Sequence, residues 1–144
     1  MAANNKLSYY SLKLNHLLKE SFPELSGDKT FIARRGQLAA KVYNDAFIDG
    51  NTIEQCNEIA EYVLFEGLHF SKFDTVFKVI CNEFDTIMAD EELRPFALKM
   101  LGVCVPVFEQ YRLTNDFADS PEFELLYTEL TGTIQIWIED HGLQ

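Results

Sequence analysis

The sequence lacks the long apolar runs, paired cysteines and glycine-rich loops that define several classes of protein. No apolar run reaches about 18 residues, so we predict no membrane-spanning helix, and the first residues lack the apolar segment of a secretion signal. The isolated glycines form neither GxxxxGKS/T nor GxGxxG, which excludes the common phosphate-binding loops. An odd cysteine count without CxxC indicates a reducing cytoplasm. We expect buried structural thiols at Cys56, Cys81 and Cys104.

Basic residues are scarce. The chain has 12 Lys and Arg against 23 Asp and Glu, a formal net charge of −11, which disfavours direct nucleic-acid binding because phosphate contacts need a basic surface. Residues 1–44 carry seven cations and three anions, whereas residues 45–144 carry five cations and twenty anions. This asymmetry fits a polar interaction surface, or basic early helices that pack against acidic later ones within one monomer.

The sequence contains no complete catalytic or metal-binding motif. The best local pair is Glu66 and His69, whose i, i+3 spacing on one helix face resembles half of a carboxylate-bridged di-metal site. The other half is missing, because no glutamate stands three residues before His16 or His141. We therefore predict no metal, no cofactor, no catalytic residue and a protein that is not an enzyme. His69 is expected to end a helix, where a cation complements the helix dipole.

Apolar residues recur with helical spacing along nearly the whole chain, and no alternating pattern is long enough for a sheet. Asp28 is placed to cap the second helix, a capping box begins at Thr52, and Ser120 followed by Pro121 opens the last helix. Leu38 is assigned to the inner face of the second helix. The predicted helices cover about 7–21, 29–49, 53–69, 72–88, 91–111 and 121–140.

One of these segments, 91–111, is expected to lie at the centre of the fold. Between residues 96 and 108 its only charge is Lys99, and a helix that is apolar on all sides is typically buried on all sides. Pro106 is expected to kink or end this helix. Short connections are typical of antiparallel helix neighbours. The sequence thus predicts an all-α fold with a single domain, 1–144, in which five to seven helices surround a buried central helix.

Aromatic residues are abundant, with twelve Phe, six Tyr and one Trp. Most fall on predicted inward faces, which core packing explains. Four are placed less clearly on those faces, namely Tyr9, Tyr10, Phe117 and Tyr127. Exposed aromatic side chains beside charged ones are typical of protein-binding surfaces. The candidate interaction surface predicted from the sequence comprises Tyr9, Tyr10, Arg34, Arg35, Glu66, His69, Phe117, Tyr127 and Glu129.

Several stretches carry a resemblance to a known family. They are EGLHFSKFD at 66–74 and ELLYTELTGTI at 124–134, joined by LSYY at 7–10 and PVF at 106–108. With these stretches the chain resembles a family of small proteins of unknown function from Bacteroidetes, often encoded near conjugative transposons. The resemblance covers most of the chain. It implies a helical, cytoplasmic single domain, and it supplies no activity, cofactor or catalytic residue.

These observations together favour a non-enzymatic, cytoplasmic helical module that binds another protein or itself as a homo-oligomer. The alternative is an acidic helical protein that acts near DNA. Such a protein would imitate phosphate charge or modulate a protein of a mobile element, and the acidic section 45–144 motivates this alternative.

Overall fold

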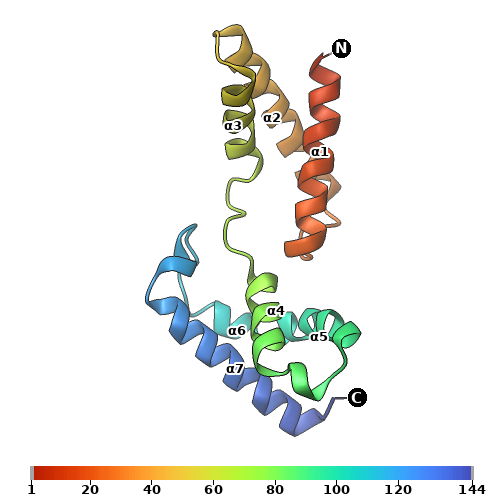
Figure 1. Ribbon diagram of the computed structural model, residues 1–144, viewed down its shortest axis with the longest axis vertical. Coiled ribbons are helices and arrows are strands. Elements are labelled where there is room, and N and C mark those ends of the chain that lie inside the picture. Colours follow the sequence, from red (N-terminus) through yellow and green to blue (C-terminus); the bar gives the residue numbers. More distant parts are fainter. Residues whose placement is uncertain (1, 144) are drawn as a thin grey trace. The chain divides into compact units, whose positions relative to one another are not determined.

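The computed structural model describes residues 2–143, with side chains from residue 6 onward, and confirms the all-α fold class. The described residues form seven α-helices, two short 3-10 helices and no strand (Figure 1). None of these helices is both long and apolar enough to cross a membrane. The α-helices are α1 (Ala2–Ser21), α2 (Lys29–Ile48), α3 (Ile53–Leu64), α4 (Lys72–Glu83), α5 (Asp90–Val103), α6 (Val105–Phe108) and α7 (Glu122–His141); the 3-10 helices are η1 (Asp85–Ile87) and η2 (Phe117–Asp119).

The chain divides after His69 into two compact units. The N-terminal unit contains α1 to α3, and the C-terminal unit contains α4 to α7. Each unit has its own buried apolar cluster, and the two clusters share no residue. The single domain expected from the sequence stays a prediction, because it concerns the cooperativity of folding, which unfolding experiments measure.

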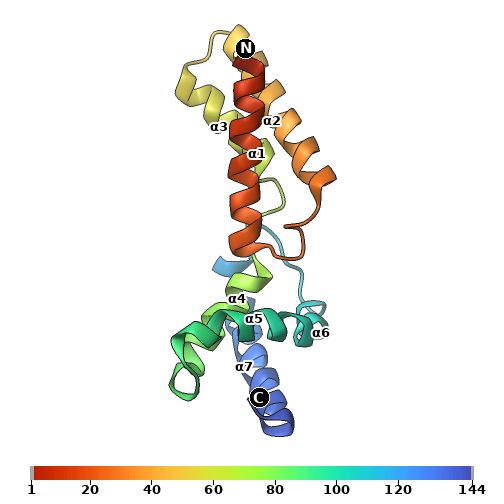
Figure 2. The same ribbon diagram turned by 90° about the vertical axis from the view of Figure 1, so that its right-hand side faces the viewer.

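In the N-terminal unit, α2 packs against both α1 and α3 (Figure 2). Polar bonds also join α1 to α3 directly, since the Tyr10 hydroxyl donates to Asn57 Oδ1 over 2.7 Å and Lys13 forms an ion pair with Glu61. Small side chains on α2 allow its neighbours to approach closely. The buried residues of α2 are Gly36, Ala39, Ala40, Tyr43 and Ala46.

Local signals fix two helix starts as the sequence predicts. The Asp28 side chain accepts a hydrogen bond from a backbone N–H in the first turn of α2, and Thr52 with Gln55 forms a complete capping box at the start of α3. The start of α7 differs. Ser120 does not cap it, because the Ser120 hydroxyl donates to the carbonyl oxygen of Phe117 over 2.7 Å.

The core of the C-terminal unit is rich in large side chains. In this unit α4 packs against α5 and α7, and α7 also packs against α6 (Figure 1). Phe96 of α5 meets Trp137 of α7 edge to face, with ring centroids 5.9 Å apart. Residues with no exposed surface in this core include Phe73, Ile80, Met100, Leu126, Leu130 and Ile134.

The segment 91–111 is not a helix buried on all sides, and that part of the sequence prediction is wrong. The helix α5 ends at Val103, and α6, with Pro106 in its first turn, follows after a one-residue break. Leu98 is 44% exposed and Val105 is 42% exposed. The buried face of α5 consists of Leu93, Ala97 and Met100. The lack of charged residues did not indicate burial on all sides, because single apolar residues are common on protein surfaces.

Gly36 sits where α2 crosses α1, and a larger residue there is expected to destabilise the protein. A Cβ atom at this position would collide with Ser11 Oγ and touch Leu7 Cδ1 at 3.5 Å. Overpacking a buried contact typically costs about 1–3 kcal/mol, so we expect Gly36→Leu to lower the free energy of unfolding by that amount, as measured in urea.

Gly132 provides the matched control for this prediction. It lies in the middle of α7, where a Cβ atom meets nothing within 4 Å. Gly132→Leu is expected to raise stability by up to about 1 kcal/mol, because leucine is the better helix former. Equal effects of the two substitutions would show that the α1–α2 contact is not tight.

Candidate interaction surface

The nine residues that the sequence marks as a candidate surface do not form one group. Six of them belong to the N-terminal unit and three to the C-terminal unit. Two of the nine are buried and five are exposed; Arg35 and Tyr127 are half-buried. The nine residues therefore have separate sets of neighbours.

Tyr10 is not a surface residue, and its assignment to the interaction surface is wrong. Its side chain is fully buried in the N-terminal core, and its hydroxyl is satisfied by Asn57. Burial, followed by the nearby Glu61, raises the pKa of Tyr10 above its ordinary value. The neighbouring Tyr9 is exposed and meets Tyr10 edge to face at 5.1 Å. The ammonium group of Lys6 lies 5.5 Å from the Tyr9 ring centre.

Phe117 is buried as well, so the sequence prediction is also wrong for this residue. Its ring packs edge to face against Phe70, Tyr111 and Phe123, and only 3% of the residue is exposed. An isolated phenylalanine between the predicted helices 91–111 and 121–140 did not indicate this cluster. The short helix η2 turns Phe117 inward, between two nearby rings and Phe70, which lies far from it in the sequence.

Tyr127 and Glu129 hold α7 in place within the C-terminal unit. The Tyr127 hydroxyl donates to Glu83 over 2.9 Å and accepts from Asn82 over 3.2 Å. Glu129 is exposed and accepts a hydrogen bond from the Tyr111 hydroxyl, which raises the pKa of Tyr111 to about 12. Both residues thus have partners within their own unit.

Glu66 and His69 do not share a helix face. The helix α3 ends at Leu64, and Gly67 has a φ of +81°, a left-handed conformation that ends regular helix. The expected helix end at His69 is therefore wrong, because His69 lies in the connection before α4. Among residues 2–143, no group of three or more His, Cys, Asp or Glu side chains is arranged to hold a metal ion.

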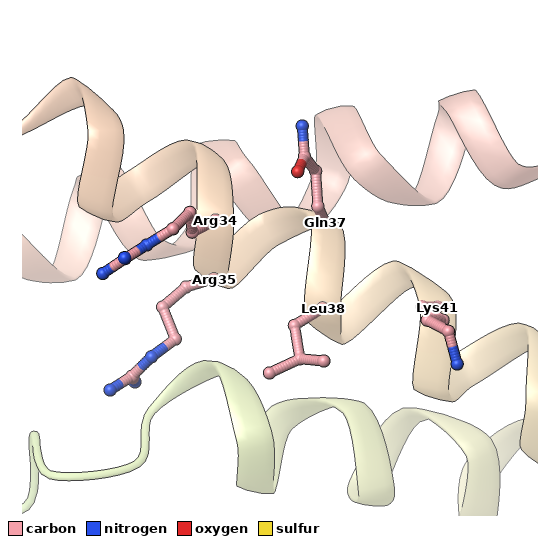
Figure 3. A pocket seen from close by; sticks show the side chains of 5 residues that line it. All are labelled: Arg34, Arg35, Gln37, Leu38 and Lys41. Atoms are coloured by element: carbon pink, nitrogen blue, oxygen red, sulfur yellow. The ribbon is translucent and has the colours of Figure 1, made fainter.

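The two adjacent arginines of α2 have different surroundings. Arg35 Nη1 donates to the carbonyl oxygens of Glu66 over 2.7 Å and Leu64 over 3.1 Å, at the end of α3. The Leu64 carbonyl is one of the last carbonyls of α3, which lack partners within the helix and carry the negative end of its dipole, and the Glu66 carbonyl follows just beyond the helix end. Arg35 therefore ties α3 to α2, whereas Arg34 is exposed beside it (Figure 3).

An open depression of about 520 Å³ lies against α2 (Figure 3). Its lining includes one large apolar side chain and three cationic side chains. The residues that line it are Arg34, Arg35, Gln37, Leu38 and Lys41. The assignment of Leu38 to the inner face of the helix is wrong, since Leu38 is 48% exposed.

The side of α2 opposite its buried residues is called here the outer face of α2. Its five residues follow one another at spacings of four and three, which keeps them on one side of a helix. All five are exposed, and Ile48 is 80% exposed. The outer face of α2 consists of Arg34, Leu38, Lys41, Asp45 and Ile48. The sequence contains this 4-3 spacing from Arg34. The outer face was not predicted, because Leu38 was assigned to the inner face of the second helix.

The acidic excess of the chain belongs mainly to the C-terminal unit. Residues 1–69 carry seven Lys and Arg against nine Asp and Glu, a net charge of −2. Residues 70–144 carry five Lys and Arg against fourteen Asp and Glu, a net charge of −9. The outer face of α2 thus lies in the less acidic of the two units. This unit repels another acidic protein less strongly than the C-terminal unit does.

The three thiols are expected to react slowly in the native protein. Cys56 and Cys104 are fully buried, and Cys81 is half-buried. Burial raises the pKa of the Cys104 thiol to about 11, so at pH 8 its thiolate fraction falls about 100-fold. With a thiol reagent at pH 8, we expect slow modification of the native chain and rapid modification after unfolding. A native thiol that reacts as fast as free cysteine would point to a nucleophile.

Comparisons with known proteins place the chain in a family. A family model described as a domain of unknown function (DUF1896) matches residues 2–143, and the chain therefore belongs to this family. The structure is similar to the crystal structure of protein PG0816 from Porphyromonas gingivalis, with a TM-score of 0.92 and 40% sequence identity over 99% of this chain and 97% of that chain. The search of curated proteins gave no significant match.

The family of unknown function and the organism of the solved relative agree with the resemblance noted from the sequence. The association with conjugative transposons stays a prediction. The matched region spans both units of the structure. Neither the family nor the solved relative supplies an activity, a ligand or a partner.

Proposed function

We propose that the chain is a non-enzymatic, cytoplasmic helical module that binds protein through the outer face of α2. The observation that carries this proposal is the exposure of Leu38 and Ile48 among charges of both signs, on the side of the helix that faces away from the core. A mixture of apolar anchors and charged neighbours is typical of surfaces that bind protein transiently. The depression beside Leu38 offers room for an incoming side chain.

The neighbouring residues of α2 support this assignment. Arg35 and the buried small residues hold the helix firmly against α1 and α3, so the outer face belongs to a rigid element. A preorganised surface binds more tightly, because less conformational entropy is lost on binding. The single ion pair on this face, between Lys41 and Asp45, is exposed and contributes little to folding stability.

Site-specific photo-crosslinking tests the proposal. A benzoylphenylalanine residue introduced at Leu38 is expected to trap a protein in cells that make the chain, and mass spectrometry then identifies the trapped protein. The control places the same residue at Gln135, which is exposed on α7. An identified protein trapped from position 38 and not from position 135 supports the proposal. The absence of any adduct from position 38 contradicts it.

The charge of the C-terminal unit favours a second candidate function, action near DNA. A net charge of −9 on residues 70–144 suits a surface that imitates phosphate charge or modulates a basic, DNA-handling protein of a mobile element. Competition between the purified chain and DNA for a basic partner tests this candidate. A competition that weakens as salt rises supports it, and no competition at low salt removes it.

A further inference from the structure

The outer face of α2 has an ordered sequence of charge and apolar character. Arg34 and Lys41 lie in its first half, and Asp45 lies in its second half. Each half also carries one large apolar side chain, Leu38 or Ile48, and these two positions are about 15 Å apart along the helix. The face is therefore basic toward the start of the helix and acidic toward its end.

This order makes the face complementary to itself when two copies run in opposite directions. If two α2 helices cross antiparallel about a two-fold axis near residue 43, Leu38 of each copy meets Ile48 of the other. In the same register, Lys41 of each copy meets Asp45 of the other. Both pairs occur twice, as the symmetry of an isologous dimer requires. A 4-3 spacing is also the pattern with which paired helices interlock.

We propose that the partner of the outer face of α2 is a second copy of this chain, bound as an antiparallel two-fold dimer; this inference rests on the proposed function. Charge complementarity selects the direction. A parallel pair places Lys41 against Lys41 and Asp45 against Asp45, and facing like charges oppose association. The antiparallel pair replaces both repulsions by attractions.

The remaining features of the N-terminal unit agree with a second copy at this face. The depression beside Leu38 receives Ile48 of the second copy, so that both apolar side chains leave water. The net charge of this unit is only −2, and the longer-range repulsion between two full chains of net charge −11 is screened by salt. A dimer through one helix face is small, and we expect it to be weak and dependent on concentration.

Sedimentation of the full chain tests the existence and the location of the dimer. The wild-type chain is expected to pass from monomer to dimer as its concentration rises. Leu38→Asp is expected to raise the dissociation constant at least about tenfold, because it buries a charge against Ile48. The matched control is Leu12→Asp, a leucine on α1 that is 70% exposed, and it should leave the constant unchanged. A dimer equally insensitive to both substitutions would lie elsewhere and overturn the proposal.

Charge reversal tests the pairing itself. Lys41→Asp alone and Asp45→Lys alone each bring like charges together in the homodimer, so each variant is expected to associate at least about tenfold more weakly. An equimolar mixture of the two variants makes both pairs attractive again and should restore the wild-type constant. Charges within each variant chain are unchanged by mixing, so recovery can arise only between copies. If the mixture associates as weakly as each variant alone, the result contradicts the proposal.

Engineered cysteines test the register. Mixed Leu38→Cys and Ile48→Cys chains should form a heterodimeric disulfide on mild oxidation, whereas each variant alone should not, because identical positions lie about 15 Å apart along the antiparallel pair. Rapid disulfide formation by either variant alone contradicts the register. A wild-type chain that stays monomeric overturns the dimer only. The proposed function then still stands if position 38 traps a different protein in cells, and it fails separately if position 38 traps none.

Discussion

Replacing Phe73 by alanine is expected to lower the free energy of unfolding of the C-terminal unit by about 3–5 kcal/mol. The Phe73 ring has no exposed surface, stacks on Phe77 with centroids 5.7 Å apart, and has the Arg94 guanidinium 4.7 Å from its centre. Its removal exposes apolar surface and leaves a cavity that the neighbouring helices fill only in part. Denaturant unfolding followed by the fluorescence of Trp137, the single tryptophan, measures the change.

The same substitution at an exposed phenylalanine provides the control. Phe47 is 58% exposed at the end of α2 and lies outside the outer face defined above. Phe47→Ala is expected to change stability by less than about 1 kcal/mol, since little buried surface is lost. If both variants lose the same free energy, burial of Phe73 does not determine the stability of this unit.

The Phe73→Ala variant also tests the single domain predicted from the sequence. Trp137 reports on the C-terminal unit alone, whereas far-ultraviolet circular dichroism reports on helices in both units. A single cooperative domain requires that both signals change at the same denaturant concentration and shift together in the variant. Two transitions, with only the fluorescence transition shifted, would show that the chain contains two domains.

Replacing Arg35 by alanine is expected to destabilise the protein by about 2–3 kcal/mol. The substitution leaves the carbonyl oxygens at the end of α3 without their charged donor and removes the guanidinium that lies 4.8 Å from the centre of the Phe31 ring. Hydrogen bonds from charged donors contribute about 1.5–3 kcal/mol. Urea unfolding followed by circular dichroism, at low protein concentration, measures the loss.

The neighbouring Arg34 gives a control of the same residue type on the same helix. Arg34 is exposed, and Arg34→Ala is expected to change stability by no more than about 0.5 kcal/mol. Arg35→Lys should recover only part of the loss, because an ammonium group does not match the planar fork of a guanidinium. Similar losses at both arginines would contradict the role of Arg35 at the end of α3.

Much of the secondary structure was determined by local sequence. The Asp28 cap, the capping box at Thr52 and the left-handed Gly142 after α7 all depend on neighbours within a few residues, which is why helical periodicity and capping residues located most helices. The predicted all-α class was confirmed for the same reason.

The candidate surface was predicted less well, because exposure depends on residues that are far apart in the chain. In the sequence, Tyr10 could not be distinguished from its exposed neighbour Tyr9. In the structure Tyr10 is buried, and its hydroxyl meets Asn57 of α3. Phe117 lies in a mostly polar stretch of sequence, and its burial depends in part on Phe70, which is far away in the chain.

The sequence by itself determined the helical class, the acidic balance and most helix starts, since these follow from short-range spacing and composition. Tertiary structure alone decided that 91–111 is buried on one side, that the two arginines have different partners, and that Leu38 faces water. The physical reason is that a helix pattern shows which residues share a side, whereas neighbouring helices decide which side is covered.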